Sequence, residues 1–254
     1  MKVAVIYNRE SLRVINLLGK RNRERYRIEA IKRITDSLKA IGHQVKTFEG
    51  DKDLVANIEM FMPAVVKGER PGMAFNLAYG IQGQARYTHI PGILEMLGIP
   101  YVGSGPLAHS LSQDKVVAKV LMRQNGLPTP DFAVLQDRDF ETPDLPFPLI
   151  VKPRSEADSF GLKVVNNEDE LRKAAGAIFD EFEQPVLAER YIDGREINVG
   201  LLGNPPEAFP PVELGFGSGP RIYTNADKGS RSGRTVEYLC PADLDEETTT
   251  RAQD

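Results

Sequence analysis

The feature that most constrains the fold is the alternation of short apolar strands with amphipathic helices in the first hundred residues. Strands are expected at 2–7, 44–50 and 73–78, and helices at 28–41 and 89–98. In the first of these helices, Ile or Leu recurs at helical spacing, and Gly42 follows as a C-cap. Strands separated by helices form parallel sheets, because the chain must cross back over the sheet between them. The sequence therefore predicts an N-terminal α/β domain.

The pattern changes after a predicted amphipathic helix at 109–125. Beyond it, we expect two hairpins (149–152 with 162–165, and 186–191 with 195–202) on either side of a helix at about 168–180. This arrangement predicts an α+β domain. The boundary is expected between about 105 and 130 and is placed near residue 110, which gives domains 1–110 and 111–254. The second has a small central subdomain at about 130–192 and the start of a C-terminal subdomain after it.

The end of the sequence, "DLDEETTT" at 243–250, has acidic residues suited to a helix N-terminus. A domain rarely ends at the first turn of a helix. We therefore expect the last part of the second domain to lie beyond residue 254.

Composition excludes several classes of function. The chain has 254 residues, a formal net charge of −4 and scattered basic residues, which argues against a nucleic-acid partner. One cysteine and three histidines allow neither an intrachain disulfide nor a zinc-type ligand cluster. The apolar N-terminal run is too short for a membrane span, so no membrane partner and a cytoplasmic location are expected.

The stretch "LIVKPRSEADSFGLKVV", residues 149–165, is the first candidate for chemistry. An apolar strand ends in Lys152, a small polar loop follows, and a second strand begins at Leu162. A surface hairpin with a solvated lysine explains this pattern without any function. The alternative is a loop that covers a polyphosphate, with Lys152 pairing with the phosphates as a point charge.

Other stretches favour the second explanation. Lys115 begins a predicted helix, and "LAERYIDGREINVG" supplies Glu189 and then Glu196 after a turn. A nucleotide site needs amines for phosphates, backbone groups for the adenine edge, and a carboxylate for the ribose hydroxyls. The run from Arg190 to Ile192 could supply the backbone groups, and Glu196 the carboxylate.

Taken in order, these stretches resemble the ATP-grasp carboxylate–amine ligases, and most closely the D-alanine–D-alanine ligase family. The matching segments run from about residue 70 to 244 and include "HSLSQDKVVAKVLM", "NGLPTPDF", "PLIVKPRSEADSFGLKVV", "VLAERYIDGREINVGLLG" and "VEYLCPADL". The resemblance implies a parallel-sheet N-terminal domain of the kind that precedes an ATP-grasp domain, followed by an α+β ATP-grasp domain whose last part is missing from these residues.

The resemblance also implies a mechanism and roles for single residues. ATP phosphorylates the carboxylate of one amino acid, and the amine of a second attacks the acyl phosphate, as in peptidoglycan biosynthesis. The implied ATP-binding residues are Lys115, Lys152, Ser159, Phe160, Gly161, Glu189, Arg190, Ile192, Glu196 and Lys228. Glu24 and Tyr79 are implied, more loosely, on the substrate side.

Several positions depart from the family pattern. The glycine pair after the first strand is absent, Tyr79 stands where the family usually has His, Gln84 lies near a usual acidic position, and Asp158 replaces a small residue beside the expected phosphates. These departures leave open a ligase for another amino acid or peptide, and a non-catalytic nucleotide-binding remnant.

The resemblance implies Mg²⁺ besides ATP, with its ligands beyond residue 254 and no metal site within the chain. The 254-residue chain itself is therefore expected not to turn over. The implied partners are small amino acids or dipeptide precursors, and a homodimer stays open.

Overall fold

A computed structural model of the chain describes residues 1–9, 26–63, 72–217, 221–228 and 232–254. It divides into two compact units, Met1–Thr129 and Pro130–Asp254. The expected boundary near residue 110 falls inside the first unit, which also contains the helices between 106 and 124. Within the described ranges, no helix has both the length and the apolar character needed to cross a membrane.

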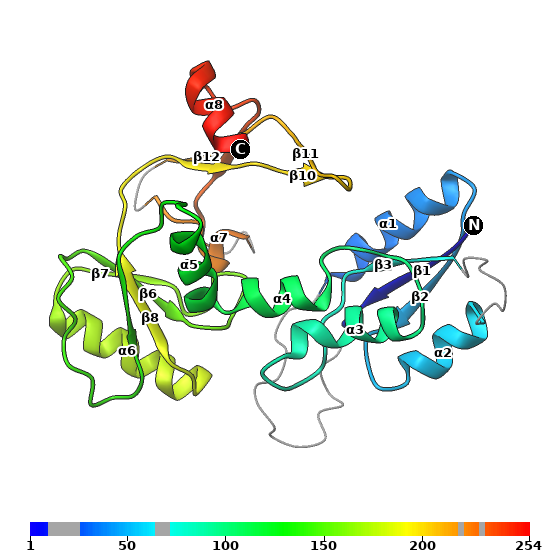
Figure 1. The fold of residues 1–254 in the computed structure, drawn as a ribbon, viewed down its shortest axis with the longest axis horizontal. Helices are drawn as coiled ribbons and strands as arrows, with labels where there is room; N and C mark the ends of the chain where they lie inside the picture. The colour runs from blue at the N-terminus through cyan, green and yellow to red at the C-terminus, as the bar shows by residue number, and fades with distance from the viewer. Residues whose placement is uncertain (10–25, 64–71, 218–220, 229–231) are drawn as a thin grey trace. The chain divides into compact units, whose positions relative to one another are not determined.

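The first unit is built on a parallel four-stranded sheet in the order β2-β1-β3-β4 (Figure 1). Its elements are β1 (Lys2–Tyr7), α1 (Ile28–Ala40), β2 (Gln44–Glu49), α2 (Leu54–Phe61), β3 (Met73–Asn76), a 3-10 turn (Arg86–Thr88), α3 (His89–Met96), β4 (Tyr101–Val102), α4 (Pro106–Gln113) and α5 (Lys115–Gln124). The parallel sheet, α1 and α3 are confirmed as predicted.

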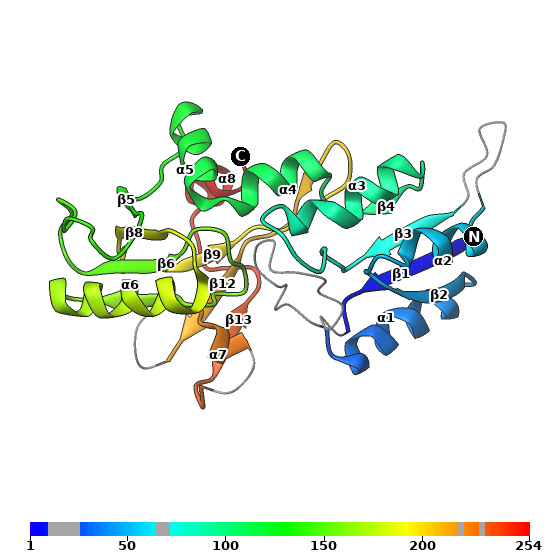
Figure 2. The ribbon, with the colours of Figure 1, turned by 90° about the horizontal axis from the view of Figure 1, so that it is seen from below.

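Alternate residues of β1 point to opposite faces of the sheet, and each face packs against helices. Ala4 and Ile6 belong to a core that includes residues of α2 and α3. Val3 and Val5 belong to a second core with Ile31 of α1. Figure 1 shows α1 and α2 on opposite sides of this sheet, and Figure 2 shows the same strands from below. A strand buried on both faces explains why β1 is apolar throughout.

One helix of this unit was not predicted, and one predicted helix was wrong. Helix α2 was not predicted, although Leu54 and Ile58 lie fully buried in the core. The predicted helix at 109–125 is two helices, because Asp114 adopts an extended conformation and its carboxylate accepts from the N–H groups of Val116 and Val117 as the N-cap of α5.

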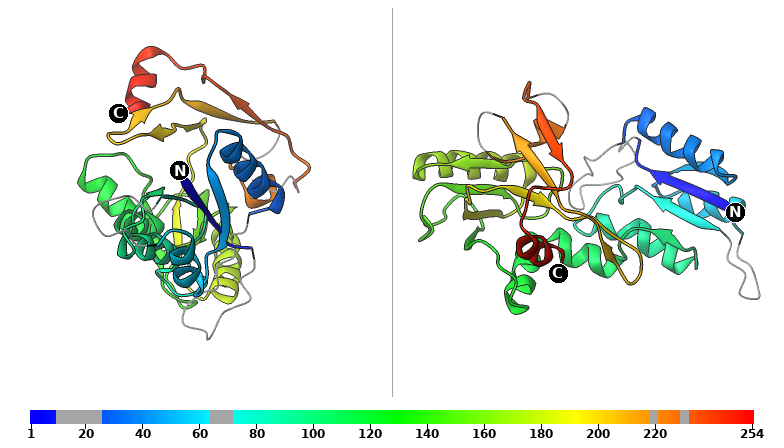
Figure 3. Two further views of the ribbon diagram at one scale, coloured as in Figure 1. Left: turned by 90° about the vertical axis from the view of Figure 1, so that its right-hand side faces the viewer. Right: turned by 90° about the horizontal axis from the view of Figure 1, so that it is seen from above.

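The second unit contains an antiparallel sheet in the order β5-β8-β6-β7, covered on one face by one helix. The elements are β5 (Phe132–Leu135), β6 (Leu149–Pro153), β7 (Lys163–Val165), α6 (Glu168–Phe182) and β8 (Val186–Arg190). Leu149, Val151 and Ala188 lie on the covered face and form a core with Leu171 and Ile178 of α6. Figure 3 shows α6 along one side of this sheet.

The rest of the second unit forms a three-stranded sheet, β13-β12-β9, and a short hairpin, β10-β11. The elements are β9 (Glu196–Asn198), β10 (Leu201–Leu202), β11 (Glu207–Ala208), β12 (Val212–Phe216), α7 (Asn225–Lys228), β13 (Val236–Leu239) and α8 (Glu246–Gln253). The predicted hairpin of 186–191 with 195–202 was wrong, because β8 pairs with β5 and β6 whereas β9 pairs with β12.

Candidate nucleotide site

The face of the four-stranded sheet opposite α6 carries the predicted lysine and glutamate. Residues that face each other in an antiparallel pair share one side of the sheet. Glu189 faces Ile150, and Lys152 faces Leu187. Since Ile150 and Lys152 are two residues apart on one strand, all four side chains lie on the same face. One face of the sheet thus packs against α6 to form the core. The second face carries Lys152 and Glu189 beside apolar side chains.

Lys152 and Glu189 form an ion pair on this second face. The Lys152 side chain is 21% exposed and that of Glu189 only 9%. A carboxylate at this depth needs a partner, because burial of an unpaired charge is strongly unfavourable. The pair fixes the ammonium group of Lys152 next to the end of β8, where the predicted adenine-binding run begins.

The loop from Ser155 to Gly161 is anchored at its base. The Ser155 N–H donates to Gln184 Oε1 at 2.6 Å, and Gln184 Nε2 donates to Glu156 Oε1 at 2.9 Å. Phe160, a predicted ATP-binding residue, packs its ring against the α6 core. Any contact of Phe160 with a phosphate must therefore come from its backbone.

The tip of this loop contacts the segment that contains α7. Ser159 Oγ donates to the carbonyl of Tyr223 at 2.8 Å, and Asn225 Nδ2 donates to Asp158 Oδ2 at 2.9 Å. Lys228 Nζ lies 3.3 Å from Asp158 Oδ1. The unexpected carboxylate of Asp158 is thus neutralised by a predicted phosphate-binding lysine. Both Asp158 and Ser159 have positive φ angles, +53° and +56°, which non-glycine residues rarely adopt.

Glu196, at the start of β9, lies beside the same segment. Burial raises the pKa of its carboxyl group, while the charge of Lys228 and a hydrogen bond from the Tyr223 backbone lower it, and the net shift is upward. The structure therefore brings Ser159, Glu196 and Lys228 together around Tyr223, as expected for residues that share a ligand.

The run from Arg190 to Ile192 follows β8. The N–H of Arg190 donates to Asp131 O at 2.9 Å, and that of Tyr191 to Pro148 O at 3.1 Å. The Ile192 side chain is 55% exposed. The N–H groups of Arg190 and Tyr191 already donate within the protein. An adenine edge would therefore have to bind the Ile192 N–H or the carbonyl groups of this run.

Three predicted residues are not in the second unit. Lys115 is the first residue of α5 in the first unit. A cation at this position is unfavourable, because the N-terminal end of a helix carries partial positive charge. Tyr79 is also in the first unit, with its ring centroid 4.6 Å from that of Tyr87 and 6.3 Å from that of His109. Glu24 lies outside the described residues. The roles of all three stay predictions.

The described residues contain no cluster of metal-ligating side chains. No group of three or more His, Cys, Asp or Glu side chains in these ranges could hold a metal ion. In the acidic run near the end, Asp245 is the N-cap of α8, and its carboxylate accepts from the Thr248 N–H at 2.7 Å. The prediction that this run begins a helix is confirmed.

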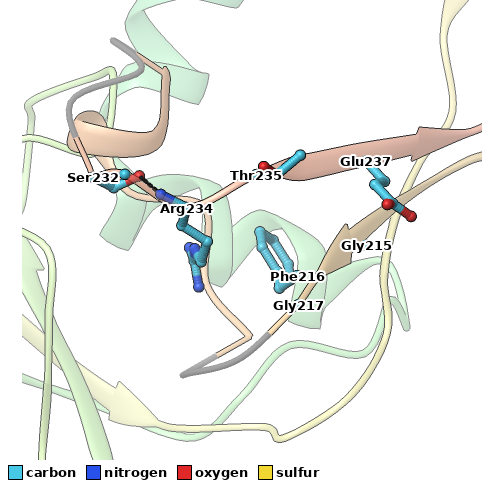
Figure 4. Close-up of a pocket in the computed structure, with 8 residues that line it drawn as sticks. Gly215, Phe216, Gly217, Ser232, Arg234, Thr235 and Glu237 are labelled. Carbon is cyan, nitrogen blue, oxygen red and sulfur yellow. Dashed lines mark hydrogen bonds between the residues drawn. The ribbon is translucent and has the colours of Figure 1, made fainter.

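One pocket of about 650 Å³ lies beside the β12–β13 pair. Its lining, shown in Figure 4, consists of Gly215, Phe216, Gly217, Ser232, Gly233, Arg234, Thr235 and Glu237. None of the predicted ATP-binding residues lines it. Sequence reasoning missed Arg234, because one arginine in a glycine-rich polar stretch gives no signal that separates it from surface charge.

Gly161 should tolerate no side chain, because it has a φ of +69° and little space around its Cα. A Cβ there would lie 2.9 Å from Phe182 Cε2 and 2.9 Å from Pro153 Cδ. We expect Gly161→Ala to lower the free energy of unfolding by about 2–4 kcal/mol, the sum of backbone strain and overpacking. Gly233→Ala is the control, since Gly233 has a φ of +70° with open space around it. Urea denaturation measures both, and equal losses would contradict the close packing at Gly161.

Comparison with known proteins identifies the family. The family described as "D-ala D-ala ligase C-terminus" matches residues 121–254. An uncharacterised protein of Sinorhizobium fredii, y4sG, is 40% identical over 259 aligned positions, which cover all of this chain and 77% of that protein. The D-alanine–D-alanine ligase of Bordetella pertussis is 36% identical over 234 positions, which cover 90% of this chain and 69% of that protein.

Solved structures show the same fold. A D-alanine–D-alanine ligase of Bacillus anthracis in complex with ATP has a TM-score of 0.69 and 21% identity, covering all of this chain and 74% of that one. The VanG D-Ala:D-Ser ligase of Enterococcus faecalis has a TM-score of 0.69 and 22% identity, covering 99% of this chain and 79% of that one. On the family match and the identity to the Bordetella enzyme, the chain belongs to the D-alanine–D-alanine ligase family of ATP-dependent carboxylate–amine ligases.

Proposed function

We propose that the second unit binds ATP on the face of its four-stranded sheet opposite α6. The observation that carries this proposal is the buried ion pair of Lys152 and Glu189 on that face, next to a backbone run with an exposed Ile192. The adenine lies against the end of β8, and Glu196 accepts from the ribose hydroxyl groups. Lys152 and Lys228 bind the phosphates, and the loop from Ser155 to Gly161 covers them.

The proposed reaction joins the carboxylate of one amino acid to the amine of another. The γ-phosphoryl group passes from ATP to the carboxylate oxygen, which leaves ADP and an acyl phosphate. The amine then attacks the acyl carbon, an amide bond forms, and inorganic phosphate leaves with the carboxyl oxygen. The lysines stabilise negative charge on the phosphoryl oxygens, and the closed loop keeps water from the acyl phosphate.

D-Alanine is the amino acid proposed for both positions, on the strength of the Bordetella relative. We place the reaction in the cytoplasm, where ATP is available. Mg²⁺ would neutralise the phosphate oxygens in such a reaction. No group of three or more His, Cys, Asp or Glu side chains in the described residues could hold it without help from the phosphates.

Incubation with ATP, Mg²⁺ and single D- or L-amino acids tests this function, with ADP and dipeptide quantified by mass spectrometry. D-Alanyl-D-alanine formed in step with ADP is the expected product. ADP release that no amino acid stimulates would contradict a ligase, and a dipeptide of other amino acids would correct the substrate.

The affinity for adenosine should depend on pH through Glu196. Because burial raises the pKa of this carboxyl group, it stays protonated to a higher pH than an exposed glutamate. Only the carboxylate form accepts from both ribose hydroxyls, so adenosine affinity should rise about tenfold as the pH rises through that pKa. Glu196→Gln should bind weakly at every pH. Calorimetry with adenosine, and with adenine as the ribose-free control, measures this, and a pH-independent affinity of the wild type would contradict the assignment.

A further inference from the structure

We propose that Arg234 is a positioning residue for ATP binding, which acts by holding Asp227 and so placing the neighbouring Lys228. This inference rests on the proposed function, because it assigns Lys228 to the phosphates of ATP. Arg234 contacts Asp227, Ile222 and Phe216 through its guanidinium group. It lies just before β13, whereas Lys228 ends α7.

The segment that contains Lys228 is too short to hold its own shape. Helix α7 spans only Asn225–Lys228, a single turn, and a single turn is unstable unless other contacts fix it. The groups that the segment presents are nevertheless arranged for one site. The Tyr223 carbonyl accepts from Ser159, and Lys228 lies next to Asp158 and Glu196. Something outside the turn must therefore hold it.

Asp227 provides one end of that support. Its side chain is 1% exposed. The carboxylate accepts from Thr224 N at 2.8 Å and from Thr224 Oγ1 at 2.6 Å, which caps the turn. It also accepts from Arg234 Nε at 3.1 Å and from Arg234 Nη2 at 2.5 Å, so the guanidinium binds both carboxylate oxygens.

Arg234 also holds the opposite end of the turn. Its Nη2 donates to the carbonyl of Ile222 at 2.7 Å. Its guanidinium carbon lies 4.9 Å from the centre of the Phe216 ring, and Figure 4 shows the two side chains next to each other. The planar guanidinium group thus binds both Ile222 and Asp227, and it packs on Phe216 of β12. Lysine cannot replace it, because an ammonium group offers no planar fork for two carboxylate oxygens.

The chain offers a matched control in Arg172. Its guanidinium binds Glu168 through Nε at 2.9 Å and Nη2 at 2.7 Å, donates to the Phe140 carbonyl at 3.4 Å, and lies 4.9 Å from the Phe140 ring centre. Arg172 therefore binds the same kinds of group as Arg234, a carboxylate, a backbone carbonyl and a phenylalanine ring, but in an exposed pair and through one carboxylate oxygen. These contacts involve α6 on the covered side of the sheet, with no link to Lys228.

A double-mutant cycle on ATP affinity tests the proposal, with the dissociation constant measured by calorimetry on the 254-residue chain. We expect Lys228→Ala to weaken ATP binding about tenfold, as for a lost charge-assisted phosphate contact. Arg234→Ala should weaken it about fivefold in the wild type and less than twofold in the Lys228→Ala background. Arg172→Ala should leave ATP affinity within about twofold in both backgrounds. Adenosine affinity should fall less than ATP affinity in Arg234→Ala.

Further outcomes separate this inference from the proposed function. If the wild type binds no ATP, both fail. Two outcomes would overturn only the positioning role, given that Lys228→Ala weakens ATP binding. Arg234→Ala could weaken binding as much in the Lys228→Ala background as in the wild type, or it could have no effect in the wild type. Should Arg234→Ala not fold, Arg234→Lys replaces it in the same cycle, and additive losses with Lys228→Ala would overturn the proposal. Circular dichroism establishes folding of every variant.

Discussion

Lys152→Met should abolish tight ATP binding and also destabilise the protein. Lys152 is the partner of a glutamate whose side chain is only 9% exposed, and its loss would leave that carboxylate buried and unpaired. We expect the free energy of unfolding to fall by about 2–3 kcal/mol, less than for a fully buried pair because Lys152 is partly exposed. ATP affinity should fall about 10- to 100-fold through the lost phosphate contact.

A second variant separates these two effects. Lys152→Met with Glu189→Leu removes both charges and leaves an apolar pair on the sheet, so stability should return to within about 1 kcal/mol of the wild type. ATP affinity should not recover, and it should be as low as in Lys152→Met or lower, because Glu189 is itself a predicted ATP-binding residue. Urea denaturation and calorimetry measure the two quantities. Recovery of ATP affinity together with stability would mean that the pair is structural and that the phosphates bind elsewhere.

Phe182→Ala should produce the largest loss of stability in the second unit. Phe182 ends α6, is 2% exposed, and belongs to the core beneath the sheet. Removal of a buried aromatic ring costs about 3–5 kcal/mol. The same ring lies against Gly161, so the loop should lose its packing as well.

Hydrogen exchange should show this second effect. Relative to the wild type, Phe182→Ala should speed the exchange of the amides of residues 155–161 more than that of the amides of β6. Phe209→Ala is the control, because Phe209 is 48% exposed and its truncation should cost less than about 1 kcal/mol. A loss as small as that of the control would contradict the role of Phe182 as the base of the loop.

Periodicity predicted the first unit well because its strands and helices alternate locally. The helical spacing in α1 and the apolar run of β1 were sufficient signals. Helix α2 was missed because its residues are mostly apolar, which hides the helical periodicity. The break at Asp114 was missed because its carboxylate caps α5 in the middle of a continuous amphipathic pattern.

The predicted hairpin of 149–152 with 162–165 is confirmed as β6 and β7, but the pairing of β9 could not be read from local sequence. β9 follows β8 after a turn, as in a hairpin, yet its partner Val212–Phe216 lies farther along the chain. The stretches around Lys152 and Glu189 were recognisable because they resemble segments of the ligase family. The Arg234–Asp227 pair was not, because its meaning comes from a buried carboxylate and a backbone carbonyl that only the folded chain brings together.

A crystal structure of the 254-residue chain with a non-hydrolysable ATP analogue tests the central claim most directly. The account predicts the adenine beside the Ile192 N–H, the ribose hydroxyls at Glu196, and phosphate oxygens within hydrogen-bond distance of Lys152 and Lys228 on the sheet face opposite α6. The Asp158–Lys228 contact should give way to phosphate. A nucleotide bound elsewhere, with the Lys152–Glu189 face empty, would contradict it.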